Sequence, residues 1–253
     1  SYSEKIIKNS NLNSDRLIPS YYGVGSAILL KSELSYIKPP HKNKIIRTPN
    51  RGGTCGIHGV QRIDSYYVGA SSMCTKEEVQ NSRAESIETL LRGSQEVLEI
   101  NMTGLSLEAT LGYRPTSIDT YPIIGPLSDN CFAIYGTKRD GLTWSPYYAK
   151  NFVDFIKGNP DEEFLELIKK CNPYRKPITF FTGKIASDFY IKSKIAENLQ
   201  HNRELSKTEI KDLKEKIENL HSHLPDDFGV HPELANILIW NSNELSKLIA
   251  LLK

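Results

Sequence analysis

The chain has 253 residues, of which 25% are charged and 39% hydrophobic, so it is long enough to bury a sizeable core. These values exclude disorder, collagen-like repeats and coiled-coil arrays as descriptions of the whole chain. The 32 Lys and Arg residues nearly balance the 30 Asp and Glu residues, which argues against nucleic acid or an anionic membrane as the main partner. No apolar run approaches the roughly 20 residues that span a bilayer, so we expect no membrane span.

The chain up to about residue 70 is rich in β-forming residues. Turn residues separate short β-type runs, which predicts an antiparallel meander with strands near 21–30, 35–37, 44–48, 54–60 and 65–70. A helix is expected next, from about Lys76 to Leu98, because apolar residues recur there at helical spacing. Thr75 and Glu78 have the spacing of a capping box at its start.

Between residues 105 and 158 the pattern changes to strand, loop and helix. Strands are predicted at 105–109 and 130–135, and a helix from Leu142 to Ile156 that ends near Gly158. A Gly-bounded turn, Gly136 to Gly141, precedes this helix. Its backbone N–H groups and the helix dipole can stabilise negative charge on a ligand.

Upstream of this helix, Arg114 lies between Gly112 and Pro115, where we expect a rigid turn. A guanidinium group suits bidentate binding of a carboxylate. Arg114 and Arg139 are therefore predicted to converge on one anionic group, with surface arginines in turns as the alternative.

After Gly158 the chain is predicted to be helical. Helices are expected at 161–171, 183–200, from Ser206 onward and at 232–252, and the second-last has a capping box of Ser206 and Glu209. Its apolar stripe is a candidate interface, although packing against the rest of the chain explains the stripe equally well. His221, His223 and His231 match no standard metal spacing, and a solvated loop is expected there.

The four cysteines are far apart and form no C-x-x-C pair: Cys55, Cys74, Cys131 and Cys171. Cys55 and His58 have a metal-ligand spacing but are two ligands short of a site, so no metal is predicted. The N-terminal residues lack the pattern of a secretory signal. Reduced thiols and a cytoplasmic setting follow as predictions.

Taken in order, the motif G-x-R-P-x-x-x-D-x-x-P-x-I-G from Gly112, a strand, the Gly136–Gly141 turn and a helix resemble a known family. They are similar to the C-terminal part of the D-amino-acid oxidase superfamily of flavoproteins, with a pattern like that of glycine oxidase. Upstream, 56–60 and 66–71 resemble strands of that family's substrate domain. The resemblance covers roughly residues 1–158.

The resemblance implies roles for three side chains. Arg114 would bind the substrate carboxylate, Arg139 would lie near both substrate and flavin, and His58 would line the substrate pocket, with a strand-face histidine as the alternative. It also implies a loop that contacts the flavin, made of Gly136, Thr137, Lys138, Arg139, Asp140, Gly141, Leu142 and Thr143. The FAD would be bound non-covalently.

One family feature is missing from the sequence. The Rossmann unit of these enzymes carries a G-x-G-x-x-G motif that holds the FAD pyrophosphate. Gly23 and Gly25 give half of that motif, but Ile28 stands where the third small residue is required. The resemblance therefore implies a C-terminal portion or subunit that needs a Rossmann-containing segment or subunit to hold FAD.

Together these observations predict an α+β fold. An antiparallel β-rich substrate domain (1–110) is followed by the returning strand, loop and helix of an FAD-binding domain (111–158) and a helical appendage (159–253). The predicted function is FAD-dependent oxidation of the C–N bond of a small-molecule amine or amino acid. The alternative is a catalytically silent binding or assembly module that retains this fold.

Overall fold

The computed structural model describes residues 2–10, 12, 16–32, 44–49, 56–62, 65–69, 72–179, 181–200 and 203–253. The fold is α+β, as predicted. Its elements in chain order are α1 (Tyr2–Lys8), β1 (Ser20–Ser32), β2 (Ile45–Arg47), β3 (His58–Gln61), β4 (Ser65–Gly69), β5 (Met73–Thr75), α2 (Ala84–Glu96), β6 (Leu105–Ser117), β7 (Ile123–Ser128), β8 (Cys131–Tyr135), α3 (Gly141–Ile156), α4 (Glu162–Cys171), α5 (Gly183–Gln200), α6 (Lys207–His221), α7 (Pro232–Ile239) and α8 (Ser242–Leu252). The predicted strand at 35–37 lies outside the described residues.

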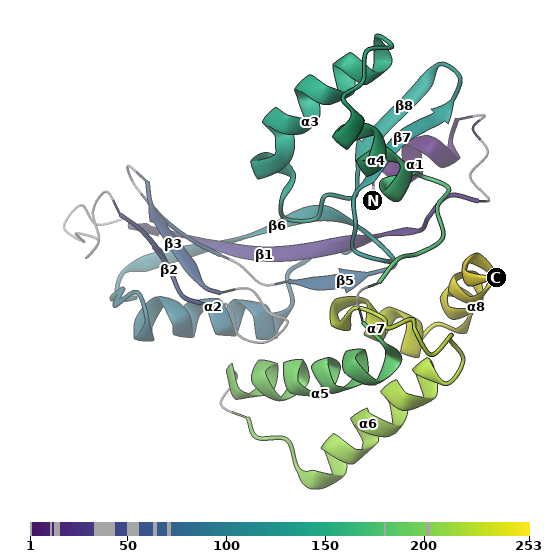
Figure 1. Ribbon diagram of the computed structural model, residues 1–253. Helices are drawn as coiled ribbons and strands as arrows, with labels where there is room; N and C mark the ends of the chain where they lie inside the picture. Colours follow the sequence, from purple (N-terminus) through teal and green to yellow (C-terminus); the bar gives the residue numbers. More distant parts are fainter. Residues whose placement is uncertain are drawn as a thin grey trace.

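Strand β1 is the centre of the main sheet (Figure 1). One of its edges pairs with β6 along its whole length, and the other pairs first with β5 and then with β4. The sheet is antiparallel, but it is not the simple meander that was predicted, because β1 joins β4 rather than β2. Both edges of β1 are paired and its residues from Ser20 to Ile28 are buried, which explains its uninterrupted run of apolar and small residues.

Helix α2 covers one face of this sheet. Ile28 and Val68 from the sheet form a core with Leu90 and Leu98, in and just after the helix. The helix begins at Ala84 rather than at Lys76, and the predicted capping box is wrong. Thr75 ends β5 instead and pairs with Tyr22, so strand pairing takes these residues out of the helix.

A second, smaller unit contains the hairpin β7–β8 and helices α3 and α4. Ile124, Tyr148 and Phe164 are among the residues of its core. Strand β7, which was not predicted, pairs with β8, which was expected at 130–135. Helix α3 ends before Gly158, whose φ of +81° suits glycine, as predicted.

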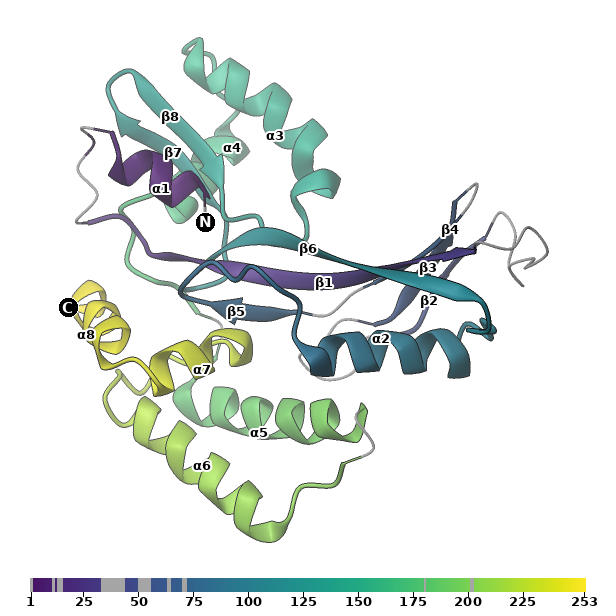
Figure 2. The same ribbon diagram turned by 180° about the vertical axis from the view of Figure 1, so that it is seen from behind.

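Helices α5 to α8 lie on the opposite side of β1 from β7, β8 and α3 (Figures 1 and 2). The predicted capping box of Ser206 and Glu209 is confirmed. The single helix expected at 232–252 is two helices, because the Asn241 side chain caps α8 by accepting a hydrogen bond from the Glu244 N–H at 3.2 Å.

This helical region is not a separate lobe, because it shares one core with the sheet and the hairpin. Tyr21 and Ile123 pack in the same cluster as Ile217, Leu220 and Leu234. The stripe of α6 therefore packs against its own chain through Ile217 and Leu220. None of the helices in the described part of the chain is long and apolar enough to cross a membrane.

Candidate functional site

Glycines form the floor of the sheet face that lies opposite α2. Residues that pair directly across antiparallel strands share a face. Gly23 pairs with Arg114 on one side and Cys74 on the other, whereas Gly69 pairs with His58. Gly25 and Gly112 also pair on this face. We call it the glycine-floored face; because these glycines carry no side chains, the Arg114 and His58 side chains can lie directly over the sheet.

Arg114 lies across this face with its guanidinium group over Gly25. A Cβ atom on Gly25 would lie 2.2 Å from the Arg114 Nη2 atom. The Nη1 atom is buried and, within the described part of the chain, has no hydrogen-bond partner. Burying such a donor without a partner costs free energy, and an anionic acceptor would remove that cost.

The position of Arg114 corrects one expectation. Arg114 and Pro115 lie within strand β6, not in a turn. A proline is tolerated there because β6 pairs fully with β1 alone, and its other edge makes one bridge, between Thr116 and Thr137, in the described structure. A strand fixes the direction of the Arg114 side chain more firmly than a turn does.

His58 lies on the same face, with its ring against Gly69. A Cβ atom on Gly69 would be 2.8 Å from the His58 Nε2 atom. Burial lowers the pKa of His58, and the positive charges of Arg47 and Arg114 lower it further, although a hydrogen bond with the backbone of Gly56 opposes them. The imidazole is therefore neutral near pH 7 and is able to donate or accept a hydrogen bond.

The turn from Gly136 to Gly141 contacts the end of β6. The Lys138 N–H donates to the Pro115 carbonyl oxygen at 3.1 Å, so the turn contacts the residue that follows Arg114. Gly136 and Lys138 both have positive φ values, +73° and +52°. Asp140 precedes α3 but makes no side-chain capping bond, so the N–H groups of the first turn of α3 are not capped by it.

Arg139 is bound to a carboxylate that the chain itself supplies. Its Nη2 atom is hydrogen-bonded to Oε1 of Glu233 in α7, and the Lys138 Nζ atom lies 3.1 Å from Oε2 of the same residue. The Glu233 side chain is only 7% exposed. Sequence reasoning missed Glu233 because it is 94 residues from Arg139 and no motif connects them.

Two further groups lie beside this ion pair. Burial and the charge of Glu233 raise the pKa of the Cys74 thiol to about 12, so this cysteine is not a thiolate at neutral pH. Burial, with the positive charges of Lys138 and Arg139, lowers the pKa of His231 to about 4. Both groups are therefore uncharged near pH 7.

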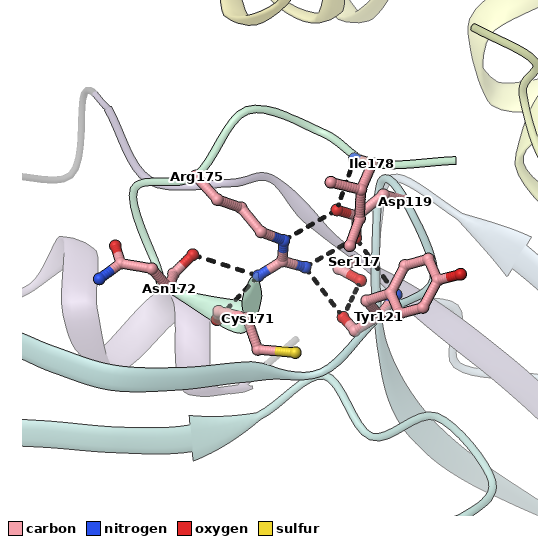
Figure 3. Close-up of polar contacts among 7 residues, drawn as sticks. All are labelled: Ser117, Asp119, Tyr121, Cys171, Asn172, Arg175 and Ile178. Atoms are coloured by element: carbon pink, nitrogen blue, oxygen red, sulfur yellow. Dashed lines mark hydrogen bonds and ion pairs between the residues drawn. The ribbon is translucent and has the colours of Figure 1, made fainter. Parts of the chain in front are cut away.

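Asp119, the acidic residue of the motif, is bound by Arg175 (Figure 3). The Arg175 Nε and Nη2 atoms donate to the two carboxylate oxygens at 2.9 and 2.8 Å, and the Ile178 N–H donates to the same carboxylate at 3.2 Å. The Asp119 and Arg175 side chains are 0% and 5% exposed. This pair ties the loop after α4 to the chain just beyond β6, and it is not accessible to a ligand.

The predicted solvated loop with three histidines is also wrong in part. The partly buried His221 ring accepts a hydrogen bond from the Val230 N–H at 3.1 Å, and its other nitrogen lies 2.8 Å from the Ser187 hydroxyl oxygen. The His231 ring accepts from the Glu233 N–H at 3.3 Å. No three His, Cys, Asp or Glu side chains are grouped so as to hold a metal ion, as far as the structure describes the chain.

The described cysteines, Cys74, Cys131 and Cys171, are free. Cys55, which has a metal-ligand spacing with His58, lies outside the described residues. The cytoplasmic setting stays a prediction from cysteine usage.

Residues 6–155 match the family described as FAD dependent oxidoreductase (DAO), which is more than half of the chain. Among solved structures, the iminodiacetate oxidase IdaA from Chelativorans sp. BNC1 is similar, with a TM-score of 0.51 and 17% identity over 68% of this chain and 43% of that one. Glycine oxidase from Bacillus cereus ATCC 14579 gives a TM-score of 0.45 and 22% identity over 66% of this chain and 43% of that one.

Glycine oxidase from Geobacillus kaustophilus gives a TM-score of 0.48 and 16% identity over 64% of this chain and 40% of that one. The chain thus spans less than half the length of these oxidases. No curated protein matches. The likeness to the iminodiacetate oxidase supports the fold, and the family match is consistent with the resemblance seen in the sequence.

Proposed function

Because the chain belongs to the family of FAD dependent oxidoreductases, we propose that it is the C-terminal portion or a subunit of an enzyme that oxidises the C–N bond of an amine or amino acid. The observation that carries this proposal is the buried, unpartnered Nη1 atom of Arg114 on the glycine-floored face. Arg114 binds the carboxylate of the substrate there. His58, which is neutral near pH 7 and shares that face, lines the pocket.

We propose a different role for each of three parts of the chain. Residues 1–110 form the substrate-binding part, residues 111–158 belong to the FAD-binding part, and residues 159–253 form the helical appendage. Strand β6 crosses the first boundary, so Arg114 is rigidly connected to the sheet that holds His58. This connection fixes the geometry of the pocket.

The segment from Gly136 to Thr143, which is the turn and the start of α3, suits one edge of a flavin. Its backbone bends through positive φ values at Gly136 and Lys138, and the N–H groups that begin α3 are free of a side-chain cap. Such donors stabilise negative charge on an electron-rich ring edge. FAD bound here without a covalent bond would accept hydride from the substrate carbon, and the residues of this chain would orient that carbon.

The described residues contain no motif that would bind the pyrophosphate of FAD. Gly23 and Gly25 lie inside β1, and no Gly-rich turn between a strand and a helix start matches the Rossmann motif in the described residues. We propose that a Rossmann-containing segment or subunit supplies it. Helix α3 offers an apolar surface for such a partner, since Leu142, Val153 and Ile156 fall on one side of the helix and are 89%, 47% and 49% exposed.

The test of this function uses Arg114→Ala in the chain together with any co-encoded Rossmann-containing partner. The KM for carboxylated amines should rise at least about tenfold, whereas the KM for an amine without a carboxylate should not change. An unchanged KM and rate for carboxylated amines would remove the assigned role. Flavin absorbance of the reconstituted sample shows independently whether FAD binds.

A second candidate is a catalytically silent module that retains the fold. The ion pair of Glu233 with Arg139 favours it, because it leaves the second predicted substrate arginine occupied. The apolar stripe of α6 does not favour it, because Ile217 and Leu220 are buried in the chain's own core. A sample that stays colourless after addition of FAD and partner would support the silent module.

A further inference from the structure

The two adjacent cations of the Gly136–Gly141 turn bind a carboxylate that the chain itself supplies. Arg139 holds one oxygen of Glu233, and Lys138 lies 3.1 Å from the other. This is the way in which an arginine and a lysine bind a free carboxylate. Glu233 reaches the turn from the first turn of α7, far along the chain.

The cations of the turn exceed the single carboxylate that they bind. The Arg139 Nε atom is buried and has no hydrogen-bond partner among the described residues, so one strong donor is unused. His231 and Cys74 are the other titratable groups beside the pair, and neither is charged near pH 7. The turn therefore keeps an unused donor even with Glu233 in place.

The backbone of the turn is held in an unusual shape while it presents these cations. Lys138 has a φ of +52°, which is costly for a residue with a side chain, and the contacts with Pro115 and Thr116 keep it there. The backbone from which the two cations extend is thus held against β6.

We propose that the Lys138–Arg139 turn is a carboxylate-binding site and that Glu233 is its internal occupant. An external carboxylate reaches the turn only when the Glu233 side chain leaves it. In terms of the proposed function, on which this consequence rests, a substrate with one carboxylate uses Arg114, and a second carboxylate must compete with Glu233.

The test is chemical complementation of Glu233→Ala in the full chain. Removal of the carboxylate leaves a space of its own shape, which acetate can fill. Acetate binding is measured by calorimetry, and the unfolding temperature is followed as acetate replaces chloride at constant ionic strength. We expect acetate to bind the variant at least about tenfold more tightly than it binds the wild type, and to raise the unfolding temperature of the variant.

Two control variants separate this site from general effects. Adding Arg139→Gln to Glu233→Ala should remove most of the acetate response, because Lys138 is then the only one of the two cations left to bind acetate. Leu248→Ala, which opens the apolar core elsewhere in the appendage, should lose stability without any acetate response. A response of equal size in Leu248→Ala, or no response in Glu233→Ala, overturns the proposal.

A further variant covers the case in which Glu233→Ala does not fold. Glu233→Gln keeps the shape and the hydrogen-bond acceptor but removes the charge, and it too should bind acetate more tightly than the wild type does. If it binds acetate no more tightly, the proposal is wrong. Acetate needs neither flavin nor turnover, so failure of the proposed oxidation and failure of this carboxylate site give different results.

Discussion

Arg114 and Arg175 both have buried guanidinium nitrogens, but the surroundings of these nitrogens differ. Every nitrogen of the Arg175 guanidinium donates to an oxygen of Asp119 or to a backbone carbonyl. Arg114, by contrast, leaves its buried Nη1 atom without a partner in the described structure. A buried charge that is fully bonded holds a structure together, whereas one that is incompletely bonded is ready for a ligand.

The same difference separates two residues of one sequence motif, one with a proposed role in ligand binding and one with a structural role. The arginine and the aspartate of G-x-R-P-x-x-x-D lie five positions apart, at Arg114 and Asp119. The first lies on the glycine-floored face, and the second is removed from solvent by a residue of the loop after α4. The predictions below test this division, beginning with the largest effect.

Replacing Asp119 with Ala should cause the largest loss of stability. The change leaves the Arg175 charge buried without its partner, which typically costs about 3–5 kcal/mol. Urea unfolding followed by circular dichroism measures the loss. The double variant Asp119→Ala, Arg175→Met should recover part of it, because no unpaired charge remains. A loss below about 1 kcal/mol for the single variant would contradict a structural role for the pair.

Replacing Arg114 with Met should affect binding rather than folding. The apolar side chain keeps much of the volume and removes a buried donor that has no partner, so the free energy of unfolding should change by less than about 1 kcal/mol. Binding of a carboxylate ligand should weaken by up to about 3 kcal/mol, roughly a hundredfold. A loss of stability as large as that of Asp119→Ala would remove the distinction between the two arginines.

His231, which lies beside the ion pair of Glu233, should make the stability of the protein depend on pH. The pKa of His231 is about 4 in the folded protein and near 6.5 in an unfolded chain, so the unfolded state binds more protons between these values. Stability due to this group is therefore present above pH 6.5 and lost as pH falls toward 4, by roughly 3 kcal/mol.

His231→Asn isolates this contribution, because Asn also caps helices and does not titrate. The variant should have a shallower loss of stability between pH 6.5 and 4, measured by urea unfolding at several pH values. His223→Asn is the matched control, since that histidine is exposed, and it should follow the wild type. The burial of His231 would be in doubt if both variants followed the wild type.

The sequence predicts the parts of the fold that local chemistry determines. The capping box of Ser206 with Glu209 forms because its bonds involve only neighbouring residues. Thr75 and Glu78 have the same spacing, but Thr75 pairs with Tyr22 in the sheet, so a contact distant in sequence overrides the local signal. The turn predicted at Arg114 is wrong for a similar reason. Pairing of β6 with β1 outweighs the turn tendency of the neighbours Gly112 and Pro115.

The candidate site divides in the same way. Arg114 and His58 were found from their motif and resemblance, and the structure brings both to one face of the sheet. Glu233 and Arg175 were missed, because each meets its partner across a long sequence separation. A charged residue that binds another element leaves no local pattern, so the sequence gives no signal that Arg139 is already occupied.

The smallest effect is expected from the glycine floor itself, where Gly25 and Gly112 form a matched pair. In Gly25→Ala the new Cβ atom would lie 2.2 Å from the Arg114 Nη2 atom, so the guanidinium must move, although its flexible side chain allows this at little cost in stability. Carboxylate affinity, measured by calorimetry, should fall by about 1 kcal/mol, roughly fivefold. A Cβ atom on Gly112 would meet nothing within 4 Å, so Gly112→Ala should bind as the wild type does and gain about 0.5 kcal/mol of stability. Equal affinity in the two variants would mean that the position of Arg114 over Gly25 does not matter for binding, and that its unpartnered nitrogen is not what receives the ligand.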